Sequence, residues 1–505
     1  MNHWIIVPIV LPALTAAFLV LALRHDLLRQ RLVSIASTAA LLAVAIALVV
    51  LADDGQTRPY AVGDWPAPFG IILVLDRLSA MMLALTAALG LAVAIYASGG
   101  WDTRGRHFHA LFQFQLMGIG GAFLTGDVFN LFVFFEVMLI ASYGLMLHGG
   151  GGRRLRAGFQ YVAINLIGST LFLFAVGLIY AVTGTLNMAD LAVKAAQVAE
   201  GDAALLSAGI FMLLLVFALK AALVPLHWWL PTAYGAASAP VAALFAIMTK
   251  VGAYAIIRVH YMVFGDAAAA AAPWIVGGAL ASMAIGALGA LATRRLGDLA
   301  AFAVVWSMGS LLVAIGMFEP GAIAAALYYA AHSTIAGAAL FLVADAVAQR
   351  RPGHGDALVL APPPTQATPL SIAFFVAAIA MCGLPPLSGF VGKLLILDAT
   401  RGPLAIWIWG GILLTSLAVI IAFARAGSLL FWKSEVVSVA AEAPAAPAIP
   451  ALRRTALPLL ALLLLPAALA GFAGPAAEYF DAAAAQIADV RGYVDAVLGA
   501  GDKGR

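Results

Sequence analysis

Five ionisable side chains stand inside long apolar stretches of the sequence. They are Glu136, Lys220, Lys250, His332 and Lys393. A charge at the centre of a membrane-spanning helix costs about 2.5 to 3.5 kcal/mol, so such residues usually face one another or water. Burial disfavours an ammonium ion and a nearby carboxylate favours it, so a buried lysine can work as a proton switch. The set predicts a row of groups that passes protons through the protein.

Glu136 lies among phenylalanines in the stretch LFVFFEVML. It stands about nine residues from the start of its expected span at 127. A helix rises about 1.5 Å per residue, so Glu136 is expected roughly 14 Å inside the membrane. A glutamate side chain is too short to reach the surface from that depth. A structural ion pair that fixes helix packing stays an open alternative to proton handling.

Two of the lysines stand next to proline breaks. Lys220 precedes Pro225 in LLLVFALKAALVPLHWWLP, and Lys393 follows Pro385 and Pro386 in CGLPPLSGFVGKLLIL. Proline removes a backbone donor and leaves carbonyl groups that need other partners. Broken helices in both halves of a chain indicate an internal repeat. A kink that only fits neighbouring helices together is the alternative interpretation.

Lys250 and His332 lie between these two lysines along the chain. Lys250 is near the middle of the run APVAALFAIMTKVGAYAIIRV, and His332 follows Tyr328 in LYYAAHSTIAGAAL. A lone histidine in an apolar helix is more often a hydrogen-bonded packing residue than an active group. Its place between two lysines favours the active role.

Uncharged polar residues line one face of a neighbouring helix. Tyr161, Asn165 and Ser169 are spaced i, i+4 and i+8, so they share a face. We expect this face to hold water molecules between the charged groups.

The composition assigns the elements that must position these residues. The hydrophobic set makes up 64% of the chain, charged residues make up 10%, and the mean hydropathy is +1.03. Soluble domains carry about 25% charged residues. Apolar runs of about 20 residues, long enough to cross a bilayer, recur from end to end. The sequence therefore predicts an all-α polytopic membrane protein.

Several other classes of site are excluded or disfavoured. The single cysteine, Cys382, excludes a disulfide, a Cys-ligated zinc site or an iron–sulfur cluster within the chain. The stretch GGGGRRLR lacks the Gly-Lys-Ser/Thr of a phosphate-binding loop, so no nucleotide or other cofactor is expected. The net charge of +3 comes from residues at helix ends and gives no reason to expect a nucleic-acid partner.

About fourteen spans are expected, each bounded by polar breaks. They lie at residues 4–23, 32–52, 70–98, 107–125, 127–147, 160–183, 204–225, 238–259, 272–292, 299–317, 321–346, 368–397, 404–432 and 455–473. The first is expected to be a retained helix and not a cleaved signal, because no basic segment precedes it.

The basic residues predict the orientation in the cell (inner) membrane. Every second loop is rich in arginine or lysine, and the loops between them hold only Arg58, Lys194 and Arg401. By the positive-inside rule the basic loops are cytoplasmic, which puts both termini outside. The stretch TRPYAVGDWPAPFGIILVLD is expected to form an outer hairpin. An Ala/Pro-rich cytoplasmic connector is expected at 435–454, and a polar or interfacial helix, prone to fraying, is expected from Pro475 onward.

Three stretches identify a family by resemblance. GDVFNLFVFFEVMLIASYGLML, FALKAALVPLHWWLPTAYGAASAPVAALFAIMTKVGAYAIIR and GLPPLSGFVGKLLIL are similar to the antiporter-like subunits of NADH-quinone oxidoreductases, membrane-bound hydrogenases and Mrp-type cation/proton antiporters. FFEVMLIASYGLML, the hairpin and ARAGSLLFWK most resemble the D-type subunits of the Mrp-type Na⁺/H⁺ antiporters. One basic position of many relatives is missing, because Ala300 and Ala301 follow RRLGDL.

The resemblance implies fourteen helices with two inverted five-helix repeats, each with a broken helix. The expected parts are 1–106 with three helices and the hairpin, 107–260 and 272–432 as the repeats, and 433–505 as connector, last helix and tail. It also implies a pair of Glu136 with Lys220.

The expected function is proton translocation in a multi-subunit Na⁺ or K⁺/H⁺ antiporter, a secondary transporter and not an enzyme. Its partners would be other subunits, monovalent cations, protons and the bilayer. The alternatives are a proton-pumping subunit of an oxidoreductase or hydrogenase, and a purely structural scaffold. Neighbouring genes would separate the antiporter from the oxidoreductase or hydrogenase.

Overall fold

Polar side chains cap the beginnings of some of the helices. The structure, a computed structural model, describes residues 3–433 and 453–499. At the start of α3 (Arg77–Ala97), the Asp76 carboxylate accepts a hydrogen bond from the Ser79 N–H, and the Ser79 hydroxyl accepts one from the Asp76 N–H. Such a box satisfies backbone donors that have no partner inside the helix. The apolar run that follows therefore starts at a defined residue.

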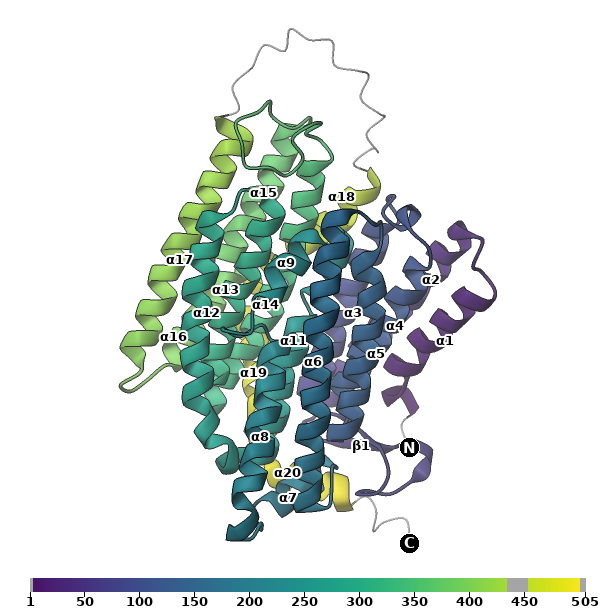
Figure 1. Ribbon diagram of the computed structural model, residues 1–505, viewed down its shortest axis with the longest axis vertical. Coiled ribbons are helices and arrows are strands. Elements are labelled where there is room, and N and C mark those ends of the chain that lie inside the picture. Colours follow the sequence, from purple (N-terminus) through teal and green to yellow (C-terminus); the bar gives the residue numbers. More distant parts are fainter. Residues whose placement is uncertain (1–2, 434–452, 500–505) are drawn as a thin grey trace.

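The described residues are mostly helical, as predicted. Besides α3, the longer helices are α1 (Val7–Leu21), α2 (Leu27–Ala52), α4 (Phe108–Leu124), α5 (Val128–Leu147), α6 (Gly152–Thr183), α8 (Glu200–Lys220), α12 (Ala272–Ala292), α13 (Leu296–Ile315), α14 (Pro320–Ala348), α15 (Ala367–Cys382), α16 (Ser388–Ala399), α17 (Ala405–Gly427), α18 (Arg453–Gly471) and α19 (Ala473–Ala488). The shorter helices are α7 (Met188–Ala195), α9 (Trp229–Ala236), α10 (Ala239–Phe245), α11 (Met248–Ala255) and α20 (Val490–Leu498). Figure 1 shows the long helices standing side by side.

The predicted hairpin is confirmed. β1 (Arg58–Ala61) and β2 (Ile72–Leu75) pair antiparallel, with Arg58 opposite Leu75 and Ala61 opposite Ile72. The first described turn, η1 (His3–Ile5), packs on β2, and α20 packs on β1. The two ends of the described chain therefore lie at one end of the bundle, here called the hairpin end and seen at the bottom of Figure 1.

The loops predicted to be cytoplasmic gather at the other end, here called the arginine end. Arg104 and Arg154 lie over the ring of Trp101. Their guanidinium carbons are 3.7 and 5.8 Å from the centre of the ring. Arg295 pairs with Asp356 at 2.6 Å. Which end faces the cytoplasm stays a prediction.

Both predicted helix breaks are present. α8 ends at Lys220, five residues before the predicted end of this span at residue 225. The next helix, α9, begins only after Pro225. The long run around Pro385 and Pro386 divides into α15 and α16. The run expected as one span at 238–259 is also interrupted, between α10 and α11. No proline marks that break, and no pattern in the sequence predicts it or the short helices α7 and α9.

Nine helical segments of the described chain are long and apolar enough to cross a membrane by themselves, or ten if the bent pair α18–α19 is one span. α1, α4 and α15 are apolar but shorter. The expected number of fourteen spans stays a prediction, because a short helix, or one half of a broken helix, is not long enough to cross a membrane by itself.

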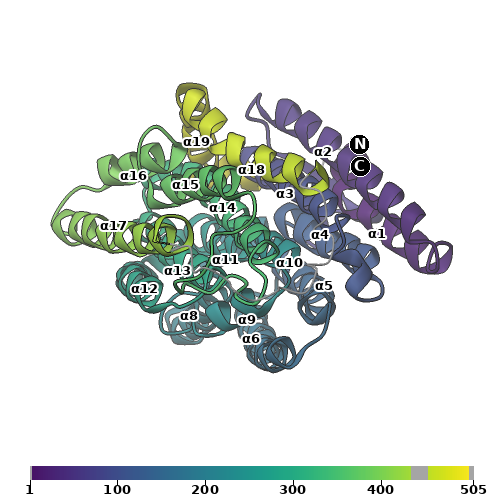
Figure 2. The ribbon, with the colours of Figure 1, turned by 90° about the horizontal axis from the view of Figure 1, so that it is seen from above.

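The centre of the bundle is α14, and the most apolar stretch of this helix is completely buried. Figure 2 shows α14 beside α10 and α11, with α1, α6 and α17 toward the outside. The predicted tail helix is present as α19, bent 81° from the preceding helix. It packs on α14 and does not fray from it. The expected connector lies, except for Arg453 and Arg454, outside the described residues.

Glycines bring two pairs of helices unusually close. A side-chain carbon added at Gly118 of α4 would lie 2.6 Å from the backbone N of Met138 in α5, and one added at Gly286 of α12 would lie 2.5 Å from that of Trp306 in α13. The sequence separation between the glycine and its partner residue is the same in both pairs. α5 and α13 also have the same length, 20 residues. The two helix pairs thus share one packing geometry.

Candidate functional site

Glu136, Asn165, Ser169 and Lys220 come together and are here called the first lysine cluster. The Lys220 ammonium donates to the Asn165 side-chain oxygen at 2.9 Å. The Ser169 hydroxyl, one turn along the same face of α6, donates to the Glu136 carboxylate. The predicted polar face of α6 therefore connects the acid to the lysine.

Glu136 and Lys220 do not form a direct ion pair. No Glu136 carboxylate oxygen lies within 4.0 Å of the Lys220 ammonium nitrogen among the ion pairs of the described residues. They are near enough for the carboxylate to attract the ammonium through space. Lys220 is 5% exposed, whereas Glu136 is only half-buried, because α5 turns the neighbouring Val133 and Ile140 outward. The acid is thus the more exposed partner.

The break after α8 explains why Lys220 can sit in the bundle. Lys220 is the last residue of α8, and Gly252 of α11 packs against it so closely that an added side-chain carbon would lie 2.9 Å from the Lys220 carbonyl carbon. The same helix carries Lys250, two residues before Gly252. Lys250 is 1% exposed, and its ammonium has no hydrogen-bond partner among the described residues. An unpaired buried ammonium is costly and marks a place where water or a neutral amine is required.

His332, Ser388, Lys393 and Ser416 form a second lysine cluster at the break between α15 and α16. His332 Nδ1 lies 2.9 Å from the Ser388 hydroxyl at the start of α16. The Lys393 ammonium donates to the Cys382 carbonyl at 2.5 Å and to the Ser416 hydroxyl at 2.9 Å. The break leaves the Cys382 carbonyl without a helical partner, and Lys393 satisfies it. Lys250 and Lys393 both act electrostatically on His332.

An aromatic ring completes the second lysine cluster. The Lys393 ammonium lies 4.1 Å from the centre of the Trp306 ring, in cation–π geometry. Trp306 is held in turn by its N–H, which donates to the Thr415 hydroxyl at 2.9 Å. Sequence reasoning missed Trp306, Ser388 and Ser416, because single polar or aromatic residues in apolar helices have no pattern of their own.

The two predicted supporting tyrosines are placed differently. Tyr161 is buried, and its hydroxyl lies 2.9 Å from the Ser142 hydroxyl. Tyr328 donates to the Leu469 carbonyl of α18 at 3.0 Å, toward the side of the bundle. The neighbouring Tyr329 faces His332, with ring centres 5.7 Å apart, and lies beside Ser310. The part of Tyr328 in a polar path stays a prediction, and Tyr329 is the residue that adjoins the clusters.

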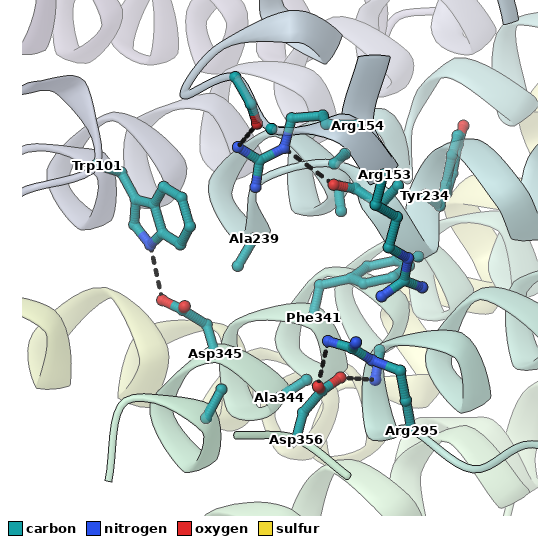
Figure 3. Close-up of a pocket in the computed structure, with 18 of the residues that line it drawn as sticks. Trp101, Arg153, Arg154, Tyr234, Ala239, Arg295, Phe341, Ala344, Asp345 and Asp356 are labelled. Carbon is teal, nitrogen blue, oxygen red and sulfur yellow. Dashed lines mark hydrogen bonds and ion pairs between the residues drawn. The ribbon is translucent and has the colours of Figure 1, made fainter. Parts of the chain in front are cut away.

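A cavity of about 390 Å³ opens above the clusters at the arginine end. Figure 3 shows Trp101, Arg154, Arg295 and Asp345 around it. Asp345 Oδ2 accepts a hydrogen bond from the Trp101 N–H at 2.8 Å, and Tyr234 in the wall donates to the Phe245 carbonyl, just before the break that leads to Lys250. No group of three His, Cys, Asp or Glu side chains that could hold a metal occurs in residues 3–433 and 453–499.

Comparison with known proteins identifies the family. Residues 125–422 match the model described as NADH:quinone oxidoreductase/Mrp antiporter, TM. The chain is 42% identical over 473 residues to the D component of a probable K⁺/H⁺ antiporter of Rhizobium meliloti (strain 1021), covering 86% of this chain and 88% of that protein. It is 36% identical over 441 residues to the D component of the Na⁺/H⁺ antiporter of Bacillus subtilis (strain 168), again covering 86% and 88%.

A solved structure agrees with these relatives. A chain of the Mrp complex from Dietzia sp. DQ12-45-1b superposes with a TM-score of 0.88 and 31% identity, covering 99% of this chain and 100% of that chain. The resemblance found in the three sequence stretches is therefore confirmed over almost the whole length. The chain belongs to the NADH:quinone oxidoreductase/Mrp antiporter transmembrane family.

Proposed function

We propose that the chain is the proton-translocating subunit of a multi-subunit Na⁺ or K⁺/H⁺ antiporter. It is a multi-pass membrane protein and a secondary transporter component, not an enzyme. The names of the two relatives, components of a K⁺/H⁺ and a Na⁺/H⁺ antiporter, support this function over the oxidoreductase alternative. The remaining subunits would be its partners in the bilayer.

One observation carries the proposal: two buried lysines sit at helix breaks, and a third lies between them. The line is Glu136, Lys220, Lys250, His332 and Lys393, with Ser169 and Asn165 between its first two members and Ser388 beside His332. A charge on one lysine repels a charge on the next, while the Glu136 carboxylate stabilises the nearest one. Movement of Glu136 toward Lys220 would hold a proton there, and movement away would send it on.

We also propose the division into two inverted repeats, 107–260 and 272–432, between the parts 1–106 and 433–505. The common geometry of the two glycine pairs supports it. The residue shift that relates Gly118 to Gly286 also relates Tyr161 to Tyr329, and Ser142 to Ser310. α4 starts at the arginine end and α12 at the hairpin end, as inverted repeats require.

The arginine end is proposed to face the cytoplasm of a cell (inner) membrane, with both termini outside. The basic loops gathered there support this orientation by the positive-inside rule. The cavity beside Asp345 would then be the inner mouth, from which Tyr234 and the α10–α11 break lead toward Lys250.

The test is antiport in everted vesicles that contain the whole complex. Lys220→Ala and Lys393→Ala are compared with the wild type, with Na⁺, K⁺ and Li⁺ in turn. We expect both variants to assemble and to transport every cation at least several-fold more slowly than the wild type, with the larger loss in Lys220→Ala. Assembled variants with wild-type transport would instead support the structural scaffold.

A further inference from the structure

A buried ion pair lies between Lys250 and the hairpin end. Arg258 donates to both carboxylate oxygens of Asp76, at 2.6 and 2.9 Å, and the two residues are 2% and 3% exposed. A buried ion pair is a weak source of stability, because the desolvation of two charges offsets much of their attraction. Neither residue belongs to the two lysine clusters.

A row of side chains connects this pair to Lys250. The Tyr254 hydroxyl accepts a hydrogen bond from Arg258 Nε at 3.2 Å and donates one to the Phe123 carbonyl at 2.7 Å. Lys250 and Tyr254 line the same cavity of about 10 Å³. A cavity needs at least about 10 to 15 Å³ to admit one water molecule. The row thus runs from an unpaired ammonium across a small cavity to a hydroxyl, and from that hydroxyl through the Arg258 guanidinium to a carboxylate.

The backbone changes its winding in this row. Arg258 lies in a π-helical segment, η4 (Ile256–Phe264), which continues α11. π turns are rare and frequently occur at functional sites. Here the wider turn directs Arg258 toward Asp76 at the start of α3.

Tyr493 of α20 covers the far side of the pair. Its ring centre lies 5.9 Å from the Arg258 guanidinium carbon, and the residue is 3% exposed. Its hydroxyl has no hydrogen-bond partner among the described residues and adjoins Gly126, where an added side-chain carbon would lie 3.3 Å from it. A buried hydroxyl without a partner costs free energy, so this contact is poorly suited to a purely structural role.

We propose that Tyr254 and Asp76 form a proton outlet from Lys250 toward the hairpin end, gated by Arg258 and closed by Tyr493. The inference rests on the proposed function, in which Lys250 carries a proton. One proton leaves the Lys250 ammonium and reaches the Tyr254 oxygen while that hydroxyl passes its own proton on. Asp76 binds this proton as Arg258 turns away, and releases it to outer water when the ion pair forms again.

The first experiment removes the relay hydroxyl and keeps the ring. Tyr254→Phe in the whole complex, in everted vesicles, is expected to lower antiport at least tenfold with the amount of assembled complex unchanged. Tyr479→Phe is the matched control, because its hydroxyl donates to the Arg77 carbonyl at the same end, outside the row. Wild-type antiport in Tyr254→Phe would overturn the outlet.

The second experiment opens the proposed gate. With no transported cation present, Tyr493→Ala is expected to dissipate an imposed pH gradient several-fold faster than the wild type. Adding Tyr254→Phe is expected to remove this leak, which a merely loosened helix would not do. The absence of a leak, or a leak that persists in the double variant, contradicts the proposal. Tyr493→Leu serves in the same way if the alanine variant does not assemble.

The same vesicles separate this inference from the proposed function. Lys220→Met tests the function alone, because Lys220 is not in the outlet. An inactive Lys220→Met beside normal Tyr254 and Tyr493 variants overturns only the outlet. An active, assembled Lys220→Met overturns the proposed function itself.

Discussion

The two lysine clusters sit at similar helix breaks but satisfy their ammonium groups in different ways. Lys220 binds a side-chain amide and has the Glu136 carboxylate in electrostatic reach. Lys393 binds a backbone carbonyl, a hydroxyl and the face of Trp306, all uncharged. In the proposed repeats, Val304 stands at the position that corresponds to Glu136.

If the proposed function holds, this contrast suits the first lysine to switching and the second to an unchanging charge environment. A carboxylate that moves by a few ångströms changes the charge balance at Lys220, since electrostatic attraction in a dry interior depends strongly on distance. A carbonyl at a helix end and a packed indole ring do not move in that way. The first cluster is thus suited to start a transfer and the second to receive it.

The largest effect is expected from Lys220→Met. It removes the proposed proton carrier beside Glu136, so antiport should fall at least about tenfold, equivalent to about 1.4 kcal/mol in the barrier. Antiport by the assembled complex in everted vesicles is the measurement. Lys194→Met is the control, because Lys194 pairs with Asp190 at the protein surface. Normal transport by Lys220→Met would erase the distinction between the clusters.

Glu136→Gln should have a large but smaller effect, because the lysine remains while its charged partner is lost. We expect the double variant Glu136→Gln with Lys220→Met to be no slower than Lys220→Met alone, since groups that act as a unit are not additive. Glu136→Gln with Lys393→Met should be slower than either single variant. Equal non-additivity in both doubles would show that the clusters are not distinct.

Asn165→Leu and Ser416→Ala compare the neutral partners of the two lysines. Asn165 supplies the closest acceptor of Lys220, and loss of a buried partner costs about 1 to 3 kcal/mol, so antiport should fall roughly fivefold or more. Ser416→Ala leaves the Cys382 carbonyl in place and should cost less than about threefold, or about 0.6 kcal/mol. Rates at saturating cation give the comparison, and the reverse order would contradict it.

The smallest effect on transport is expected outside both clusters, at Asp102 in the loop before α4. Burial alone would raise the pKa of Asp102, but hydrogen bonds from Arg31 at 2.6 Å and His109 at 3.0 Å outweigh it and hold the pKa below its ordinary value. The stability from this carboxylate is therefore complete above about pH 4 and is lost as the pH falls through the lowered pKa.

Asp102→Asn should leave the antiport rate per assembled complex unchanged and lower the thermal stability at about pH 7. The difference from the wild type should shrink as the pH falls from about 4 through the lowered pKa, below which the wild-type carboxylate is also neutral. Thermal unfolding at both pH values measures it. A difference that does not change with pH would show that the charge of Asp102 is not what stabilises the loop.

Much of the fold follows from local sequence. Apolar runs predict the long helices, and prolines predict the breaks after Lys220 and before Lys393. The break before Lys250 could not be predicted, because it contains neither proline nor glycine and is held by packing against neighbouring helices. Short helices such as α9 also stayed hidden, since their few residues show no clear period.

The candidate site was predicted where a charge interrupts an apolar run. The i, i+4, i+8 spacing correctly put Asn165 and Ser169 on one face toward the first cluster. Trp306 could not be predicted as part of the site, because a tryptophan in an apolar helix is usually a packing residue. Its contact with the Lys393 ammonium is visible only in the structure. The buried pair of Asp76 with Arg258 joins residues far apart in sequence, which only the tertiary fold reveals.

The glycines at 118 and 286 have a consequence for protein engineering. Two helix pairs whose backbones approach so closely tolerate little change in the spacing of those backbones. The residue at the contact differs between the two pairs, Met138 in one and Trp306 in the other. New ion-handling groups are therefore best grafted onto the inner faces of α5 or α13, while the small residues that seat these helices are left alone.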